Sequence, residues 1–383
     1  MFKIIYNLRF WGYPVETHWV KTPDNYILAL HRIPGRGNKS ATKFRRNASR
    51  FTQEETEDCG VVFLQHGLLD SSATWVINLP DQSLGFVLAD AGCDVWMGNI
   101  RGNMYSTNHT TLSPKEAAFW EFSFDEFAGL DLPAMLGYVL GETGAAKLAY
   151  IGHSQGTLMG FIAFSQNKDL AARISLYTAL APVARITYIR GLIKALKIVE
   201  PGVVGLYKIL GWNEFEPSDL FKTELAALIC PWAERLICNN FCFLIAGYDL
   251  SNLNTTRVPV YGAHVPAGTS VRNMVHWTQL LTDQKLQKYD YGSVKKNMIH
   301  YNSSSPPEYD ISTLGVPTAL FSGGNDFLAD PRDVAWLEGQ LHPSVVVSNT
   351  FYDEYNHLDF VWGLDASKRF YGHILDLVIK FNS

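Results

Sequence analysis

Three residues far apart in the chain have the types and the order that nucleophilic catalysis by a serine requires. Ser154 lies in Gly152-His153-Ser154-Gln155-Gly156, which fits the pattern G-x-S-x-G, and Asp326 and His357 follow later in the sequence. A serine hydroxyl is a weak nucleophile at neutral pH, so it needs a histidine as base and a carboxylate that orients this histidine. We therefore expect Ser154 as nucleophile, His357 as general base and Asp326 as the acid.

The surroundings of Ser154 support this interpretation more strongly than the pentapeptide alone. An apolar run at 148–151 precedes it and a helix-compatible stretch at 157–164 follows it. A sharp turn between strand and helix holds the serine in a strained conformation with its hydroxyl accessible. Small residues must then let helix and strand approach, and three glycines supply this clearance: Gly152, Gly156 and Gly160. The alternative is an ordinary glycine-rich turn with an incidental serine, and the flanking pattern disfavours it.

The acid and the base each follow a late apolar run, as expected for groups at the carboxyl ends of parallel strands. Asp326 could instead cap the next helix, and Asp330 or Asp333 would then be the partner of His357. For His357 the alternative is a histidine with a purely structural role. The other histidines lack this placement, and His153, although it adjoins the nucleophile, is expected to point elsewhere.

Two backbone N–H groups are candidates for stabilising the negative charge that develops on an attacked carbonyl oxygen. One belongs to Gln155, the residue after the nucleophile. The other belongs to Leu68, because His66-Gly67 follows the apolar run at 61–65 directly. An ordinary turn at the end of a strand is the alternative interpretation of His66-Gly67.

The elements that must position these residues form an alternating pattern. Apolar runs recur at 61–64, 95–97, 148–151, 177–180 and 318–321. Continuous apolar strands indicate burial on both faces, and helical segments such as 125–140 separate them, so we expect an α/β fold with a mostly parallel sheet. Residues 26–33 alternate in part and follow a turn, which predicts an edge hairpin.

The strand pattern stops between residues 184 and 306, where amphipathic pieces such as 187–199 and 218–238 take over. We therefore expect one core in two parts, residues 1–184 and 310–383, interrupted by a helical cap at 185–309. Apolar residues at helical spacing in the cap suit a lid, although packing on the core would give the same pattern. A charged stretch at 36–58 is expected to be a solvated loop.

Composition narrows the functional classes further. The net charge of −5 gives no electrostatic reason to expect nucleic acid as a partner. Five cysteines are too few for a disulfide scaffold and too poorly spaced for zinc. No uncharged apolar run reaches the length of a membrane span, and the N-terminus lacks the apolar run and cleavage site of a signal peptide. Four sequons permit glycosylation: Asn47, Asn108, Asn254 and Asn302.

Taken together, these motifs closely resemble the acid lipase family of the α/β-hydrolase fold, which includes gastric and lysosomal acid lipases. The resemblance extends over nearly the whole chain, and the stretches that carry it are Phe10-Trp11-Gly12-Tyr13-Pro14, Phe63-Leu64-Gln65-His66-Gly67-Leu68-Leu69, Asp90-Ala91-Gly92-Cys93-Asp94-Val95-Trp96-Met97-Gly98-Asn99, Gly152-His153-Ser154-Gln155-Gly156, Pro266-Ala267-Gly268-Thr269-Ser270 and Tyr355-Asn356-His357-Leu358-Asp359-Phe360.

The resemblance implies the triad Ser154, Asp326 and His357 and oxyanion positions at Leu68 and Gln155. It also implies a cap with a lid, glycosylation, and a lysosomal or secreted location. A cap disulfide between Cys230 and Cys238 follows from the same resemblance, with Cys242 as a competing partner and three free cysteines as the alternative. The implied substrates are triacylglycerols or cholesteryl esters at a lipid–water interface.

We expect acyl transfer in two steps, in which an acyl-enzyme forms on the serine and is then hydrolysed, without metal or cofactor. Two alternatives are a soluble carboxylesterase for short acyl chains and a catalytically silent lipid carrier. A serine at the turn disfavours enzymes of this fold that use aspartate there. Activity at lysosomal pH would require a lowered pKa for His357, because an unperturbed histidine, with a pKa of about 6.5, is then mostly protonated.

Overall fold

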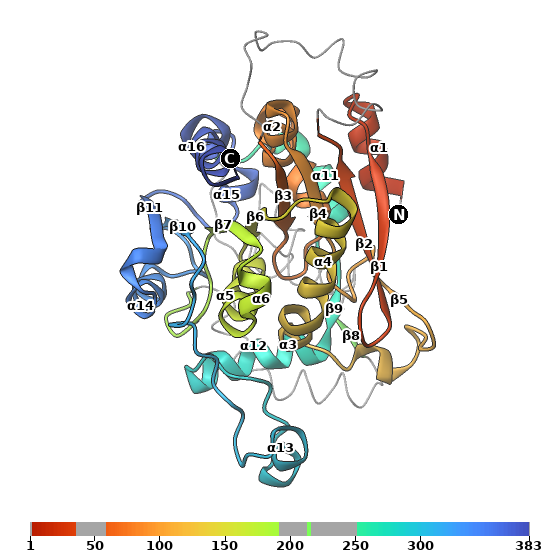
Figure 1. The fold of residues 1–383 in the computed structure, drawn as a ribbon, viewed down its shortest axis with the longest axis vertical. Coiled ribbons are helices and arrows are strands. Elements are labelled where there is room, and N and C mark those ends of the chain that lie inside the picture. The colour runs from red at the N-terminus through yellow and green to blue at the C-terminus, as the bar shows by residue number, and fades with distance from the viewer. Residues whose placement is uncertain (1, 36–58, 191–212, 216–250, 383) are drawn as a thin grey trace, which may run out of the picture.

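The computed structural model describes residues 2–35, 59–190, 213–215 and 251–382 (Figure 1). The charged stretch expected as a loop at 36–58 lies outside the described residues. The same holds for the predicted helix at 218–238 and for most of the one at 187–199.

The centre of the molecule is a mixed, mostly parallel β-sheet (Figure 1). β1 and β2 pair antiparallel, β2 pairs antiparallel with β4, and the strands from β4 to β11 are parallel to one another. The order across the sheet is β1 (Glu16–Lys21), β2 (Tyr26–Ile33), β4 (Asp94–Gly98), β3 (Val61–Gln65), β6 (Leu148–His153), β7 (Ile174–Leu180), β10 (Thr318–Gly323) and β11 (Val346–Tyr352). The short β5 (Asn108–His109) pairs with β2.

The predicted strands are confirmed, and so is the predicted hairpin. β1 and β2 form the hairpin, with β1 at the edge of the sheet and β2 next to it. In β3, β6, β7 and β10 every residue is buried. Such strands have no solvent-facing side, which explains why their sequences are apolar without alternation.

Helices cover the sheet on its two faces. In Figure 1, α4 (Leu132–Thr143) and α5 (Gln155–Gln166) lie in front of the strands, while α2 (Leu84–Ala91) packs against β4 and α16 (Gly372–Asn382) against β6 and β7. The other α-helices in the described part of the chain are α1 (Phe2–Phe10), α3 (Phe124–Glu126), α6 (Lys168–Ala171), α11 (Val258–His264), α12 (Val271–Asp283), α13 (Val294–Tyr301), α14 (Pro331–Gln340) and α15 (Asp359–Trp362).

The helix predicted at 125–140 is present as α3, a π-helical turn Phe127–Asp131 and α4. Ser123 starts it because its side chain accepts from the first turn while the side chain of Glu126 returns to the Ser123 backbone, which is a capping box. The helix ends at Gly144, whose φ of 70° lies in the left-handed region that glycine tolerates.

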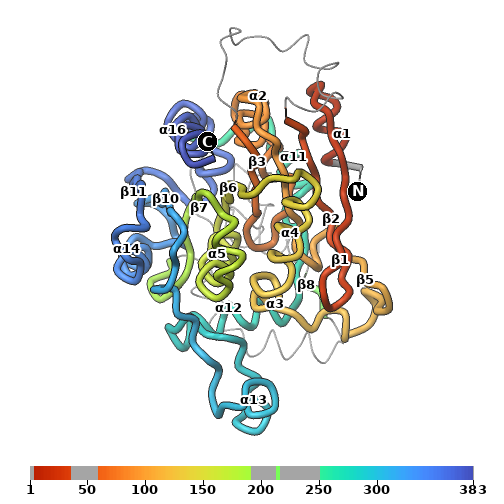
Figure 2. Tube along the Cα trace, viewed as in Figure 1, coloured from red at the N-terminus to blue at the C-terminus, as the bar shows by residue number. Residues whose placement is uncertain are grey.

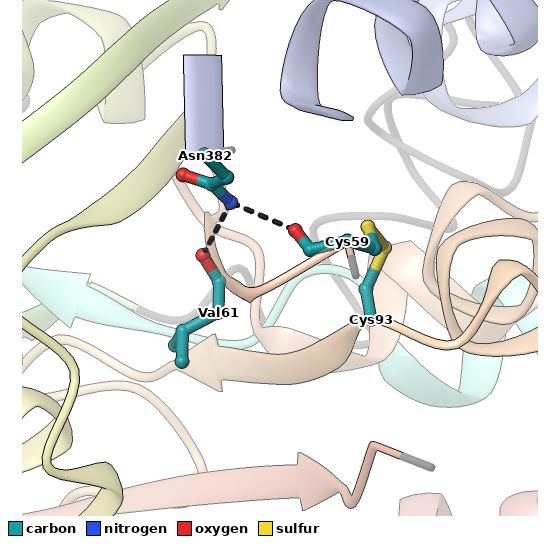
Figure 3. Close-up of a disulfide and its surroundings, with 4 residues drawn as sticks. All are labelled: Cys59, Val61, Cys93 and Asn382. Atoms are coloured by element: carbon teal, nitrogen blue, oxygen red, sulfur yellow. Dashed lines mark hydrogen bonds between the residues drawn. A yellow bond between two sulfur atoms is a disulfide. The ribbon is translucent and has the colours of Figure 1, made fainter. Parts of the chain in front are cut away.

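A disulfide joins Cys59 to Cys93 (Figure 3). Cys59 lies two residues before β3 and Cys93 directly before β4, and these strands pair in parallel with Val61 opposite Asp94. Asn382 at the end of α16 donates from Nδ2 to the carbonyl oxygens of Cys59 and Val61, at 2.9 and 3.3 Å. The disulfide and the last helix thus fix the start of the central strands. This bond was not predicted from the sequence, and the expected Cys230–Cys238 pair lies outside the described residues.

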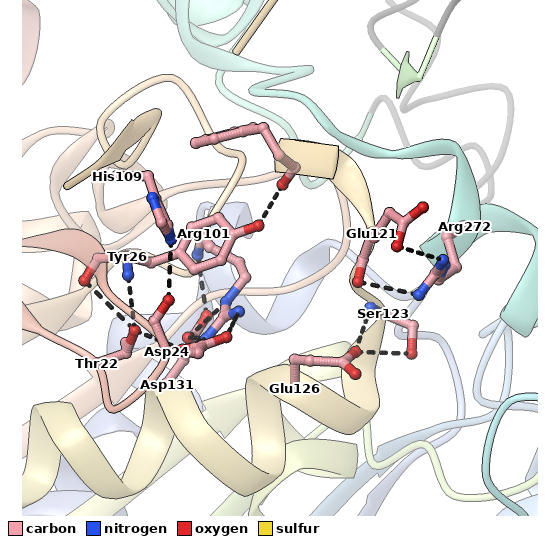
Figure 4. A network of polar contacts seen from close by, with 11 residues as sticks. Thr22, Asp24, Tyr26, Arg101, His109, Glu121, Ser123, Glu126, Asp131 and Arg272 are labelled. Carbon is pink, nitrogen blue, oxygen red and sulfur yellow. Dashed lines mark hydrogen bonds and ion pairs between the residues drawn. The ribbon is translucent and has the colours of Figure 1, made fainter. Parts of the chain in front are cut away.

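A buried arginine ties the loop after β4 to two other elements (Figure 4). The Arg101 side chain is 1% exposed and forms ion pairs with Asp131, before α4, and with Asp24, in the β1–β2 turn. Its Nε lies 2.8 Å from Asp131 Oδ1. A buried guanidinium that lost its partners would raise the free energy of the folded protein. The ion pairs of Arg101 therefore hold the loop after β4 in one place.

The segment between β7 and β10 contributes α11, α12 and α13 to the described part of the chain. α12 crosses the lower edge of the sheet in Figures 1 and 2, and α13 projects beyond it. The division into 1–184, 185–309 and 310–383 stays a prediction. Within the described ranges, no helix has both the length and the hydropathy needed to cross a bilayer.

Candidate active site

The turn at Ser154 has the geometry expected of a nucleophile at the end of a strand. β6 ends at His153, α5 begins at Gln155, and Ser154 between them has φ 53° and ψ −121°. A positive φ is unusual for a residue with a side chain and is found at strained functional turns. Ser154 is 9% exposed, and its backbone N–H donates to Leu180 O at 3.1 Å, which fixes the turn to β7.

Glycine is required where the turn meets neighbouring chain segments. A Cβ on Gly156 would lie 2.4 Å from the backbone oxygen of Gln65, and one on Gly152 would lie 2.7 Å from the carbonyl group of Gly156. A Cβ on Gly160 would lie 2.9 Å from the ring of Tyr177. The expected role of the three glycines in giving clearance is therefore confirmed.

Asp326 and His357 lie together although 31 residues separate them. The Nδ1 atom of His357 is 2.8 and 3.0 Å from the two carboxylate oxygens of Asp326, so Nδ1 carries the proton that is donated. Oδ1 of Asp326 also accepts from the backbone N–H groups of Leu328 and Ala329, both at 2.8 Å. These bonds fix the carboxylate and leave Nε2 of the imidazole as an acceptor.

The imidazole nitrogen of His357 that stays unpaired, Nε2, is the one that a general base needs. His357 is 2% exposed, and its Nε2 is buried without a hydrogen-bond partner among the described residues. The His153 and His357 rings are 5.0 Å apart between centroids, so the imidazole lies beside the turn that carries Ser154.

The two alternative aspartates lie elsewhere. Asp330 caps α14 and pairs with the guanidinium groups of Arg190 and Arg332. Asp333 accepts from Arg185 and from the backbone N–H of Tyr188. Of the three aspartates, Asp326 is the one that the fold brings to His357.

The two predicted oxyanion residues belong to segments that meet at Ser154. Gln155 is the first residue of α5, so its backbone N–H has no acceptor within the helix. The loop with Leu68 approaches from β3: a Cβ on Gly67 would lie 3.0 Å from the Cβ of Ser154. Leu69 has φ 58°, and its carbonyl accepts from the backbone N–H of Ala267 at 2.7 Å.

His66 holds this loop from the inside. Burial lowers its pKa to about 4, so the ring is neutral near physiological pH. Its Nδ1 donates to Gly67 O at 2.8 Å, and its Nε2 therefore accepts from the amide of Asn103 at 3.1 Å. His66 therefore fixes the loop that carries Gly67 and Leu68, which an ordinary turn at the end of a strand would not require. Asn103 supports this histidine and was not predicted from the sequence.

We expected His153 to point elsewhere, but its ring lies beside His357 in the candidate site. Its Nε2 donates to the backbone carbonyl of His357 at 2.9 Å, across 204 residues of sequence. Burial lowers the pKa of His153 to about 3, so the ring stays neutral over most of the acidic range. The ring has this orientation because β6 ends at His153, where the chain directs the imidazole toward the loop that carries His357.

The candidate glycosylation sites differ in accessibility. Asn108 and Asn302 are exposed. Asn254 is 9% exposed, and its Nδ2 donates to the side chain of Gln82 at 3.0 Å. Asn47 lies outside the described residues. Glycosylation stays a prediction, which the surface position favours at Asn108 and Asn302.

Comparison with known proteins finds relatives over nearly the whole chain. The model of the α/β hydrolase fold matches residues 60–364, and that of a partial α/β-hydrolase lipase region matches residues 4–79. The chain is 46% identical to human lysosomal acid lipase/cholesteryl ester hydrolase, over 98% of this chain and 90% of that protein. It is 45% identical to human gastric triacylglycerol lipase, over 97% of this chain and 89% of that protein.

The chain belongs to the acid lipase family. The predicted fold class, an α/β-hydrolase core, is thereby confirmed. As a member of this family, the chain is a carboxylic ester hydrolase.

Solved structures that resemble this acid lipase family member show how widely the fold is shared. A monoglyceride lipase from Saccharomyces cerevisiae aligns with a TM-score of 0.55 and 14% identity, over 97% of this chain and 96% of that one. An epoxide hydrolase from Vigna radiata aligns with a TM-score of 0.52 and 13% identity, over 96% of this chain and 99% of that one. At such identities the likeness concerns the fold alone.

Proposed function

We propose that this chain hydrolyses neutral lipid esters, triacylglycerols or cholesteryl esters, through an acyl-enzyme on Ser154. The observation that carries the proposal is the His357–Asp326 pair, whose Nε2 remains unpaired beside the strained turn of Ser154. The alternative of a silent lipid carrier gives no reason for a buried imidazole with this orientation.

In the proposed reaction, Nε2 of His357 removes the proton of the Ser154 hydroxyl while Oγ attacks the ester carbonyl. The backbone N–H groups of Leu68 and Gln155 stabilise the charge that develops on the carbonyl oxygen. His357 then gives the proton to the departing alcohol. Water, activated by the same imidazole, cleaves the acyl-enzyme and releases the fatty acid.

The choice of substrate rests on the relatives. One is named for cholesteryl ester hydrolysis and another for triacylglycerol hydrolysis, and both match over nearly the full chain. We place the substrate at a lipid–water interface, with the predicted cap at 185–309 and its lid over the site. A preference for dissolved short-chain esters is the competing hypothesis.

We propose a lysosomal or secreted location on the same grounds. The Cys59–Cys93 disulfide supports it, because such bonds persist in oxidising compartments and are rare in the cytosol. The exposed sequons at Asn108 and Asn302 fit this location.

The test is hydrolysis of emulsified triolein, cholesteryl oleate and dissolved p-nitrophenyl butyrate between pH 4 and 8, by the wild type and Ser154→Ala. We expect long-chain activity in the wild type and its loss in the variant, with Ser154 labelled by a fluorophosphonate. Retained turnover in Ser154→Ala would reject the nucleophile, and activity confined to p-nitrophenyl butyrate would reject the lipase assignment. An absence of activity below pH 6 would reject the lysosomal location.

A further inference from the structure

The side chain of Gln155 is held by the helix α12, which belongs to the segment between β7 and β10. Gln155 is fully buried, and its Oε1 accepts two hydrogen bonds. One comes from Nδ2 of Asn273 at 2.9 Å and the other from Nε1 of Trp277 at 2.8 Å. Asn273 and Trp277 are four residues apart, so they lie on the same face of α12.

The same segment also holds the opposite side of the candidate oxyanion hole. The backbone N–H of Ala267 donates to Leu69 O at 2.7 Å, and Ala267 O accepts from the backbone N–H of Met104 at 2.8 Å. Leu69 directly follows Leu68, whose N–H is the second candidate donor. Residues 267–277 thus contact the chain next to both donors.

Residues 121–124 anchor α12 to the core. The Ser270 hydroxyl, at the start of the helix, donates to Phe122 O at 2.5 Å. The ring of His276 stacks on that of Phe124, with centroids 3.7 Å apart. Arg272 reaches both the backbone oxygen and the carboxylate of Glu121 (Figure 4). α12 is therefore a fixed support against which a side chain can be oriented.

We propose that Asn273 and Trp277 are positioning residues that orient the backbone N–H of Gln155 toward the oxyanion. The inference rests on the proposed function, since it requires an oxyanion at Ser154. Gln155 is at the first position of α5, where no helical hydrogen bond fixes its N–H. Anchoring the far end of its side chain restricts the rotation of this residue, and donors fixed in advance of the reaction stabilise an oxyanion best.

A role in packing alone would not need this arrangement. An apolar side chain of similar length could fill the space between α5 and α12 without this cost: burying an amide is costly where it is unpaired, and Nε2 of Gln155 is buried without a partner among the described residues. Here two donors converge on a single oxygen atom of Gln155, and one of them is an indole N–H, which can only donate.

The test uses Trp277→Phe, which removes the N–H but keeps a ring against Phe124, from which the indole lies 5.5 Å away between centroids. The matched control is Thr278→Ala on the same helix, whose hydroxyl donates to Val275 O. We expect kcat for p-nitrophenyl butyrate to fall at least about tenfold in Trp277→Phe, with KM within about twofold of the wild type. The affinity for an alkylboronic acid, whose serine adduct places an oxygen in the oxyanion hole, should fall by a similar factor.

A double-mutant cycle separates positioning from packing. Gln155→Met keeps the backbone N–H but offers only a weak sulfur acceptor in place of the amide oxygen, so adding Trp277→Phe to it should cost little more. Equal effects of Trp277→Phe in both backgrounds would overturn the proposal. A raised KM with unchanged kcat would overturn it too, because Trp277 would then bind substrate. Thermal melting of each variant identifies loss of fold. Asn273→Ala removes the second donor without adding a charge, and an unchanged kcat in this variant would also contradict the proposal.

Failure of the inference and failure of the proposed function can be told apart. If Ser154 is not the nucleophile, the wild type is not labelled by a fluorophosphonate and Ser154→Ala keeps its activity. If only the positioning role is wrong, the wild type is labelled and Trp277→Phe is labelled at the same rate.

Discussion

The imidazole of His153 donates a hydrogen bond to the backbone carbonyl of His357, at 2.9 Å. The residue before the candidate nucleophile therefore holds the backbone of the candidate base. Asp326 holds the side chain of the same residue. Base and nucleophile are thus connected through neighbouring residues.

Replacing His153 should lower the rate of reaction rather than the affinity for substrate. His153→Leu removes the donor, and we expect kcat to fall about 10- to 100-fold because a small displacement of a base has effects of this size. His153→Gln offers an amide N–H in its place and should keep most of the activity. The measurement is kcat and KM on a dissolved ester, with melting temperatures as the check on folding. Equal activity of His153→Leu and the wild type would contradict the role.

Asp326→Asn should lower kcat by about 10³- to 10⁴-fold, because an amide neither stabilises the imidazolium nor selects the tautomer with the proton on Nδ1. Asp330→Asn is the matched control, since Asp330 lies four residues further on and pairs with arginines. We expect the control to keep activity within a few-fold of the wild type. If Asp330→Asn lowered kcat more than Asp326→Asn, Asp330 would be the acid that orients His357.

Much of this geometry could be predicted because it follows from local patterns. Uninterrupted apolar runs marked the buried strands, and the fold places polar residues at the carboxyl ends of those strands. Asp326 and His357 could therefore be chosen from their positions after β10 and β11. Ser154 was marked by the glycines that the close packing of its turn requires.

The remaining contacts could not be predicted because they depend on how distant segments pack. Gln155 and Trp277 are 122 residues apart, and no local pattern signals an indole that reaches the residue after the nucleophile. The Cys59–Cys93 bond did leave a signal. Each cysteine shortly precedes a predicted strand, and neighbouring parallel strands bring such positions together.

Removing the Cys59–Cys93 bond should cost stability without affecting catalysis directly. The bond closes a loop of 34 residues, and the loss of chain entropy in the unfolded state corresponds to about 3–4 kcal/mol. We expect Cys59→Ser combined with Cys93→Ser to unfold at a lower temperature and a lower denaturant concentration, with kcat nearly unchanged below the transition. Wild-type protein treated with a reductant in denaturant and then refolded should behave alike. An unchanged denaturation midpoint would contradict the prediction.

Asp70, two residues after Leu68, should make the stability depend on pH. Burial raises the pKa of this carboxyl to about 7. The backbone N–H of Ser71 donates a hydrogen bond to the carboxyl group and partly opposes this rise. A folded-state pKa above the unfolded value of about 3.8 favours the folded protein below pH 4, and this contribution is lost as the pH rises through 7. The difference corresponds to about 4 kcal/mol at most.

Asp70→Asn keeps an acceptor for Ser71 and removes the charge. We therefore expect the variant and the wild type to melt at similar temperatures near pH 4, and the variant to melt several degrees higher at pH 8, where the wild type must bury a carboxylate. The exposed Asp81→Asn serves as the control and should change neither value. A variant that is less stable than the wild type at pH 8 would show that the ionised carboxylate of Asp70 stabilises the oxyanion loop. The Asp70 charge would then have to be counted among the groups that hold Leu68 in place.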